Sequence, residues 1–152
     1  MLLALLLALT CGRELWEMKV LRDPDAAAAL RPAPVPSTIV MLIHVPPKGS
    51  IRRSYTVEGT VTVIKHEADS DYHVVIEDEA HHTMIVEFPH PGCSKGSLAY
   101  GAIVKARKQA ATLKLGMRVR VTGMLFMDKI HGQTGVAPNG VELHPVFNVE
   151  VP

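Results

Sequence analysis

The sequence is poor in aromatic residues, in cysteines and in excess charge. One Trp, three Tyr and three Phe occur among 152 residues, whereas proteins that bind single strands stack bases on aromatic rings. The two cysteines, Cys11 and Cys93, are too few for a disulfide scaffold; they could pair, or leave Cys93 free. Sixteen basic side chains against 15 acidic ones give a formal charge of +1, without the basic excess of a duplex-DNA binder. The totals argue against a dedicated duplex-DNA binder and weaken the case for a single-strand binder, but they allow a local basic groove.

An uninterrupted apolar run, MLLALLLALT, occupies residues 1–10. It is shorter than the roughly 20 residues of a membrane-spanning helix, and it matches the hydrophobic region of a secretory signal. No Lys or Arg precedes it, and no A-x-A cleavage site follows it. We expect export, either to the periplasm or with anchoring to the membrane through this segment, and lipidation of Cys11 is the less favoured variant. If the run is an ordinary N-terminal helix, a cytoplasmic location follows.

Composition divides the chain into three parts. Residues 1–30 are a signal-like or helical segment, because Ala-rich sequence follows the apolar run. Residues 31–53 form a Pro-rich linker, in which residues 39–45 are a possible short extra strand. Residues 54–152 carry the regular patterns of a folded domain.

Alternation of apolar and polar side chains is the clearest pattern in the third part. Tyr55, Val57 and Gly59 alternate with threonines and a glutamate, which predicts a strand buried on one face. The mid-strand Gly59 indicates a bulge or a sharp bend. The same period predicts further strands over residues 71–78, 83–89, 117–127 and 141–151.

Residues 94–115 have helical spacing instead, with Gly116 at the predicted end. The order is therefore three strands, one helix and two strands. This order predicts a mainly β fold, a five-stranded OB-type Greek-key barrel with one helix between its third and fourth strands, preceded by the N-terminal apolar or helical segment.

Two segments add a resemblance to known families. DSDYHVVIEDEAHHTMIVEFP, residues 69–89, is similar to the second-and-third-strand hairpin of small bacterial OB domains. HGQTGVAPNGVELHPV, residues 131–146, resembles a segment of uncharacterised bacterial proteins that carry a signal or lipoprotein leader. The resemblance implies an exported OB-like domain and implies no particular activity.

The segment between the last two strands is the most distinctive candidate site, because OB-folds use this loop to bind ligands. It gathers polar groups around three glycines, and the candidate ligand-binding residues are His131, Gln133, Thr134, Asn139 and His144. A purely structural loop is the alternative, since Asn139-Gly140 is a strong turn signal.

Arg118 and Arg120 are further candidates, because alternation places both on the outward face of the fourth strand. Together with helix lysines they could bind a polyanion or an oligonucleotide. A solvated surface is the alternative interpretation.

Neither metal, cofactor nor catalytic residues are predicted. The eight histidines do not match zinc-site spacings, and no G-x-S-x-G motif occurs. Asp69, Asp71, Glu77 and Asp78 lie where OB-type thermonucleases place Ca²⁺-binding acids, but the matching arginine pair is missing. We therefore expect these acids to serve turns and solvated edges.

The leading hypothesis is a non-catalytic, exported or envelope-associated OB-fold binding module, rather than an enzyme, whose ligand is unknown. One alternative is a single-stranded nucleic-acid-binding OB domain. The other is a metal-dependent hydrolase or nuclease that uses His131, His144 and the acidic hairpin.

Overall fold

The computed structural model describes residues 9–49 and 52–152. Short elements come first: α1 (Trp16–Lys19), α2 (Ala26–Leu30), β1 (Val35–Pro36) and α3 (Ile39–Leu42). The main part of the chain then forms β2 (Ser54–His66), β3 (Tyr72–Glu77), β4 (Thr83–Phe88), the 3-10 turn η1 (Pro91–Cys93), α4 (Tyr100–Ala110), β5 (Arg118–Met127) and β6 (Val141–Glu150).

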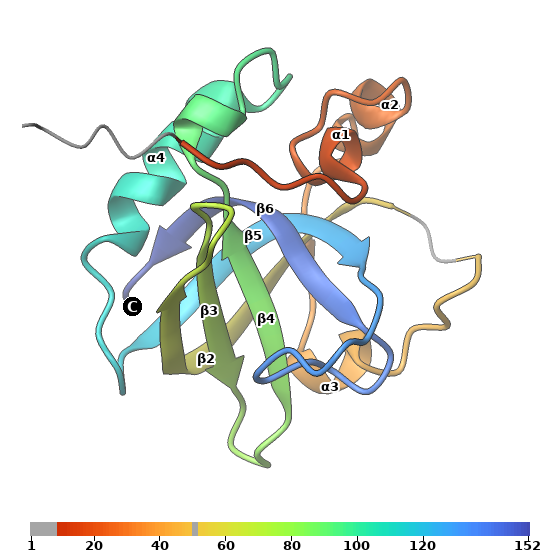
Figure 1. Ribbon diagram of the computed structural model, residues 1–152. Helices are drawn as coiled ribbons and strands as arrows, with labels where there is room; N and C mark the ends of the chain where they lie inside the picture. Colours follow the sequence, from red (N-terminus) through yellow and green to blue (C-terminus); the bar gives the residue numbers. More distant parts are fainter. Residues whose placement is uncertain (1–8, 50–51) are drawn as a thin grey trace, which may run out of the picture.

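Strands β2 to β6 close into a barrel (Figure 1). β2, β3 and β4 form an antiparallel meander, β4 pairs with β6 in parallel, and β5 lies between β6 and β2. This strand order, with α4 between the third and fourth barrel strands, is that of an OB-fold. The predicted fold class is therefore confirmed.

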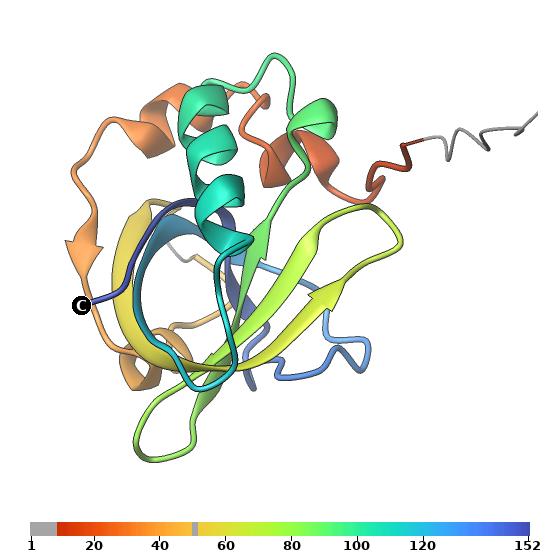
Figure 2. The same cartoon turned by 90° about the vertical axis from the view of Figure 1, so that its left-hand side faces the viewer.

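The barrel interior is filled by inward rows of aliphatic side chains, among them Val57, Ile76 and Val86. Helix α4 covers one open end of the barrel and α3 lies at the opposite end (Figure 2). Ala106 and Ala110 of α4 and Leu42 of α3 belong to the same buried cluster as the strands. Helix α3, which lies within the predicted linker, thus contributes to the barrel core.

The extra strand predicted over residues 39–45 is wrong, because this segment contains α3. The Thr38 hydroxyl accepts a hydrogen bond from the Met41 amide, which caps the helix. Ile39, Leu42 and Ile43 are buried together at helical spacing. The additional strand is instead β1, inside the Pro-rich linker, and it pairs in parallel with the start of β2.

The irregularity of β2 lies between Val61 and Val63, beyond Gly59. Strict alternation predicts that Val63 follows Val61 in the inward-facing row. Because of the irregularity, Ile64 packs against the core instead. A Cβ atom on Gly59 would lie 3.1 Å from side-chain atoms of both Ile39 and Ile76. Gly59 therefore permits close packing of α3 and β3 against the curved first barrel strand.

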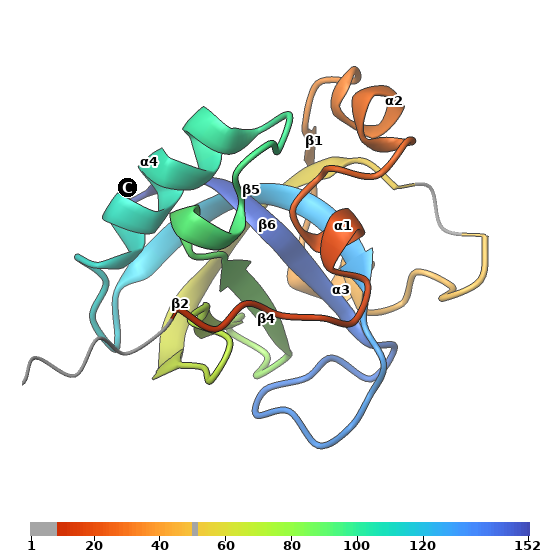
Figure 3. The ribbon, with the colours of Figure 1, turned by 45° about the horizontal axis from the view of Figure 1, so that its top comes forward.

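Residues 9–21, here called the N-terminal strap, run in front of β4 and β6 (Figure 3). A disulfide between Cys11 and Cys93, with Cα atoms 5.5 Å apart, ties the strap to η1. The Trp16 indole N–H donates to the Cys93 carbonyl at 3.1 Å. The first eight residues of the predicted signal lie outside the described residues. Within residues 9–49 and 52–152, no helix is long and apolar enough to cross a membrane.

Candidate functional site: an acidic groove on the barrel face

A hollow of about 470 Å³ lies on the outer face of β3, β4 and β6. The loop after β2, the loop between β5 and β6, and the strap enclose it. We call it the acidic groove, and it is lined by Lys19, Lys65, Glu67, Ala68, Asp69, Asp71, His73, Glu87, Asp128, His131, Gly132, Gln133, Thr134, Glu142 and His144. Six carboxylic acids thus face two lysines and three histidines.

Strand alternation places the polar groups of the groove. Val74, Val86 and Leu143 point into the barrel core, so the adjacent His73, Glu87, Glu142 and His144 point outward. Such positions normally face water, yet all four are buried here. The strap and the β5–β6 loop cover them, and Gly135 of that loop lies so close to Val75 that a Cβ would overlap its side chain.

His73 and Glu87 form one pair across β3 and β4. The Nδ1 atom of His73 lies 2.8 Å from Oε1 of Glu87. Its Nε2–H donates to the carbonyl oxygen of Thr134 at 2.9 Å, since a carbonyl can only accept. The imidazole therefore connects the strand face to the β5–β6 loop.

His144 and Glu142 form a second pair, with His144 Nδ1 3.0 Å from Glu142 Oε1. The other ring nitrogen, Nε2, lies 3.6 Å from Oδ2 of Asp71, beyond hydrogen-bond length. Trp16 of the strap meets the His144 ring edge-on, with centroids 6.4 Å apart. The strap thereby shields this pair from solvent.

Three polar atoms of the groove have no hydrogen-bond partner among the described residues. They are Asp71 Oδ2, Glu87 Oε2 and His144 Nε2. Asp71, Glu87 and His144 are only 2%, 8% and 3% exposed, and an unsatisfied buried polar group costs about 1–3 kcal/mol. Because native cores rarely tolerate such groups, three in one hollow mark a candidate functional site.

Burial keeps these groups uncharged near neutral pH. It raises the pKa of Asp71 to about 8 and that of Glu142 to about 8. Burial, followed by repulsion from Glu142, raises the pKa of Glu87 well above its usual value. Burial also lowers the pKa of His144 to about 3, so the Glu142–His144 contact is a neutral hydrogen-bonded pair. Shifts of this size, concentrated in one hollow, are typical of functional sites.

The two lysines lie at the edges of the groove. Lys19 Nζ is 3.5 Å from Asp128 Oδ1 and 5.2 Å from the centre of the Phe126 ring. Lys65 donates to the Thr134 hydroxyl at 2.6 Å. Neither contact involves the three unpartnered atoms of the groove.

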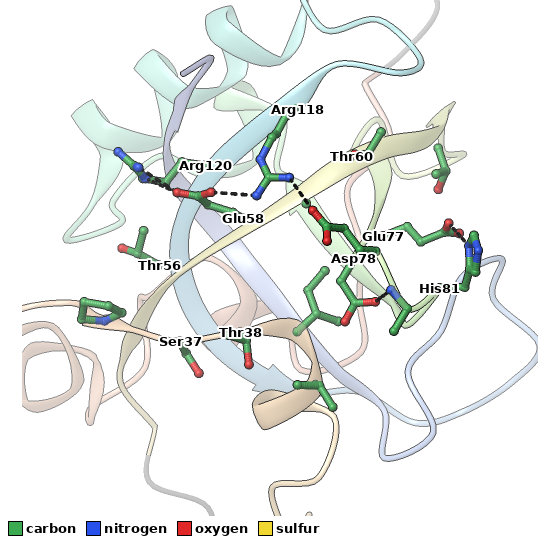
Figure 4. Close-up of a pocket in the computed structure, with 17 residues that line it drawn as sticks. Ser37, Thr38, Thr56, Glu58, Thr60, Glu77, Asp78, His81, Arg118 and Arg120 are labelled. Atoms are coloured by element: carbon green, nitrogen blue, oxygen red, sulfur yellow. Dashed lines mark hydrogen bonds and ion pairs between the residues drawn. The ribbon is translucent and has the colours of Figure 1, made fainter.

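A second and larger groove, of about 980 Å³, lies between the start of α3, β2 and the β3–β4 turn. Glu58 sits between two arginines there, accepting from Arg120 at 2.7 Å and from Arg118 at 3.2 Å (Figure 4). These hydrogen bonds hold the pKa of Glu58 below its usual value. Arg118 also lies 3.6 Å from Glu79. Because these charges pair with one another, we place the candidate site in the acidic groove.

The predicted site residues are divided between three places. Four of them, His131, Gln133, Thr134 and His144, line the acidic groove. Arg118 and Arg120 line the second groove. The Asn139 amide donates to the carbonyls of Leu42 and Val45, both at 2.9 Å, and so fixes the end of α3.

Other groove residues were not identified from the sequence. Asp71, predicted in a solvated turn, is buried; one of its oxygens accepts a hydrogen bond from the His90 amide. Glu87 and Lys19 were not singled out either, and Glu142 was noted only as one polar residue of the segment between the last two strands. The sequence signal for these residues was a row of outward polar side chains on adjacent strands. That pattern is the same whether the row faces water or is covered by another segment.

Two further arginines, Arg107 and Arg52, make contacts within the fold. Arg107 stacks on Tyr72 at 3.4 Å and donates to the carbonyls of Phe88 and Ser70. Arg52 pairs with Asp23 at 2.7 Å. These arginines fasten loops and the strap. Across residues 9–49 and 52–152, no three His, Cys, Asp or Glu side chains are arranged to hold a metal ion.

No protein-family model matches the chain, and no curated protein matches it. Among solved structures, an asparaginyl-tRNA synthetase from Entamoeba histolytica is 14% identical with a TM-score of 0.50, over 79% of this chain and 24% of that chain. The S. pombe Stn1–Ten1 complex is 17% identical with a TM-score of 0.46, over 66% of this chain and 57% of that one. A small single-stranded DNA-binding protein from Streptomyces coelicolor is 13% identical with a TM-score of 0.40, over 68% and 94%. The chain thus spans only part of the first two, and these similarities concern the fold alone.

Proposed function

We propose that this protein is a non-catalytic OB-fold binding module whose ligand occupies the acidic groove. The three unpartnered buried atoms, Asp71 Oδ2, Glu87 Oε2 and His144 Nε2, are the observation that carries the proposal. A bound ligand with complementary polar groups would satisfy them and recover the free energy that their burial costs.

The position of the groove supports the same function. OB-folds bind ligands on the face of their second and third strands, between the loop after the first strand and the loop before the last. Here these elements are β3, β4 and the two loops that enclose the groove. The groove combines this position with a side-chain chemistry that barrel packing does not require.

Single-stranded nucleic-acid binding is the second candidate, since the same face of OB-folds binds oligonucleotides. Lys65 and the strap lysine, Lys19, supply positive charge at the rim. Against it stand the six carboxylic acids of the groove, which repel phosphates once they ionise. We therefore rank it below a ligand that carries no negative charge.

We further propose that the protein acts in an oxidising compartment, as an exported protein. The Cys11–Cys93 disulfide supports this proposal, because disulfides persist in secreted and periplasmic proteins and are rare in the cytosol. A lipid thioether on Cys11 and this disulfide exclude each other. Mass spectrometry after alkylation without reductant tests the proposal: unmodified, linked cysteines are expected in protein from its native cell, and two alkylated cysteines would contradict it.

The binding function is tested by NMR titration of the isotope-labelled, disulfide-intact chain. The probes are a short oligothymidylate, maltotriose, glutarate and an N-acetyl-lysine amide, which represent four ligand chemistries. We expect at least one probe to shift the amide signals of His73, Glu87 and Glu142 without shifting those around Glu58. If no probe shifts the groove signals, the proposed function is wrong.

A further inference from the structure

The unpartnered atoms of the acidic groove indicate what kind of ligand it takes. Carboxylate oxygens accept hydrogen bonds, and two of the three atoms belong to Asp71 and Glu87. Lys19 and Lys65 contact Asp128 and Thr134 at the edges of the groove, so they do not serve as these partners. The missing partner is therefore a donor, and a positive charge on it would stabilise the ionised carboxylates that burial alone disfavours.

His144 can present a third acceptor at the same place. When its Nδ1–H donates to Glu142, at the 3.0 Å distance found here, Nε2 carries a bare lone pair. That lone pair lies 3.6 Å from Asp71 Oδ2. One donor atom can bridge two acceptors at this spacing, because each can then lie within ordinary hydrogen-bond length of it.

A primary ammonium group fits this arrangement. It carries three donors and no acceptor on one nitrogen, whereas a guanidinium spreads its donors over a wider planar fork. Lys19 shows that the groove already attracts such a group, since its ammonium lies 3.5 Å from the groove residue Asp128. A hollow of about 470 Å³ leaves room for the alkyl chain that carries the amine.

We infer that the acidic groove binds a primary ammonium group between Asp71, Glu87 and His144. This inference rests on the proposed function and specifies the ligand class of the same site. Two sources carry this chemistry, the lysine side chain of a peptide and a free alkyl diamine, and the experiment below separates them.

The test measures binding to the full disulfide-intact chain by NMR and calorimetry. The probes are the N-acetyl-lysine amide, its norleucine analogue without the amine, the arginine analogue and 1,5-diaminopentane. We expect the lysine probe to bind at least about tenfold more tightly than the norleucine and arginine analogues. Tighter binding of the diamine than of the lysine probe assigns the ammonium to a free amine, and the reverse order assigns it to a peptide.

Variants locate the binding. Asp71→Asn keeps the shape of the side chain and removes its ability to ionise beside a bound ammonium, and it should weaken lysine-probe binding about tenfold or more. Glu79→Gln, at a carboxylate whose side chain is 93% exposed on the other groove, is the matched control and should leave binding unchanged. Lys19→Met removes a like charge at the edge of the groove and should strengthen binding about threefold.

The outcomes separate this inference from the proposed function. Equal binding of the lysine and norleucine probes overturns the ammonium site. Groove shifts caused only by oligothymidylate, maltotriose or glutarate also overturn it, while the groove remains the binding site. If no probe shifts the groove, both proposals fail. Circular dichroism on each variant shows whether a loss of binding reflects a loss of fold.

Discussion

Asp71 is the residue at which fold and proposed function conflict most directly. It is 2% exposed, one of its oxygens accepts from the His90 amide, and the other has no partner among the described residues. The first contact shapes the loop after β2, whereas the second oxygen only destabilises the ligand-free protein. Sites for binding often retain such destabilising groups, because selection preserves function above a stability threshold.

Replacing this carboxyl group should therefore stabilise the protein. Asp71→Asn keeps an acceptor for the His90 amide and places an amide donor near the His144 lone pair. Burial raises the pKa of the folded Asp71 carboxyl to about 8, so near pH 7 folding must keep protonated a group that is ionised in the unfolded chain. An amide does not ionise, so the variant avoids this free-energy cost. We expect a gain of roughly 1–3 kcal/mol in the free energy of unfolding near pH 7.

Urea unfolding of the wild type and the variant measures this gain. Asp25→Asn, at an exposed acid on the strap side of the molecule, is the control and should stay within about 0.5 kcal/mol of the wild type. A loss of stability in Asp71→Asn would show that its carboxyl group serves the fold.

At the scale of elements, the strap decides whether the barrel face is exposed or enclosed. The disulfide closes a loop over a sequence separation of 82 residues and holds Trp16 against His144. The sequence predicted all five barrel strands and the intervening helix, because alternation and turn residues are local signals. The cover depends on the pairing of Cys11 with Cys93, which was only one of two alternatives that the sequence left open.

The same limit explains the mixed outcome for the candidate residues. His73 points away from the core, as alternation along β3 requires, yet it is 4% exposed. Loop composition pointed to His131, Gln133 and Thr134, which line the groove. Glu87 looked like an ordinary outward residue, since nothing within its own strand indicates what lies above it.

Removing the disulfide should loosen the strap. Cys11→Ser combined with Cys93→Ser should lower the free energy of unfolding by about 2–4 kcal/mol. Trp16 is the single tryptophan of the chain, so its fluorescence reports on the strap alone. We expect its emission to move to longer wavelength as its indole, now 8% exposed, meets water.

Reduction of the wild type under native conditions provides a matched comparison and should give the same emission shift. Unchanged emission and unchanged stability in the double variant would mean that packing alone holds the strap.

At the scale of the whole molecule, the groove makes stability depend on pH. Between about pH 6.5 and 8 an unfolded chain has ionised Asp71 and Glu142, whereas the folded protein retains both protons. The folded state then binds more protons than the unfolded state, so stability falls as pH rises through this window. His144 opposes this trend only below about pH 6.5, where the unfolded chain gains a proton that the folded protein does not.

We therefore expect the free energy of unfolding to fall by about 1 kcal/mol or more from pH 6.5 to 8. Lys19, Asp69, Asp128 and Arg107, together with His73 and His131, also face these groups. Thermal unfolding at several pH values measures the slope, and Asp71→Asn should reduce it. A flat profile in the wild type would show that the groove carboxyls titrate normally.

The most direct test of the binding function combines stability and binding in one pair of proteins. The titration with the four-probe panel is repeated on a double variant, Asp71→Asn with Glu142→Gln, beside the wild type. We predict that the double variant unfolds at a higher temperature and no longer shows the groove shifts that the wild type shows. Groove shifts of unchanged size in the more stable double variant would contradict the account, because the buried carboxyl groups would then have no part in binding.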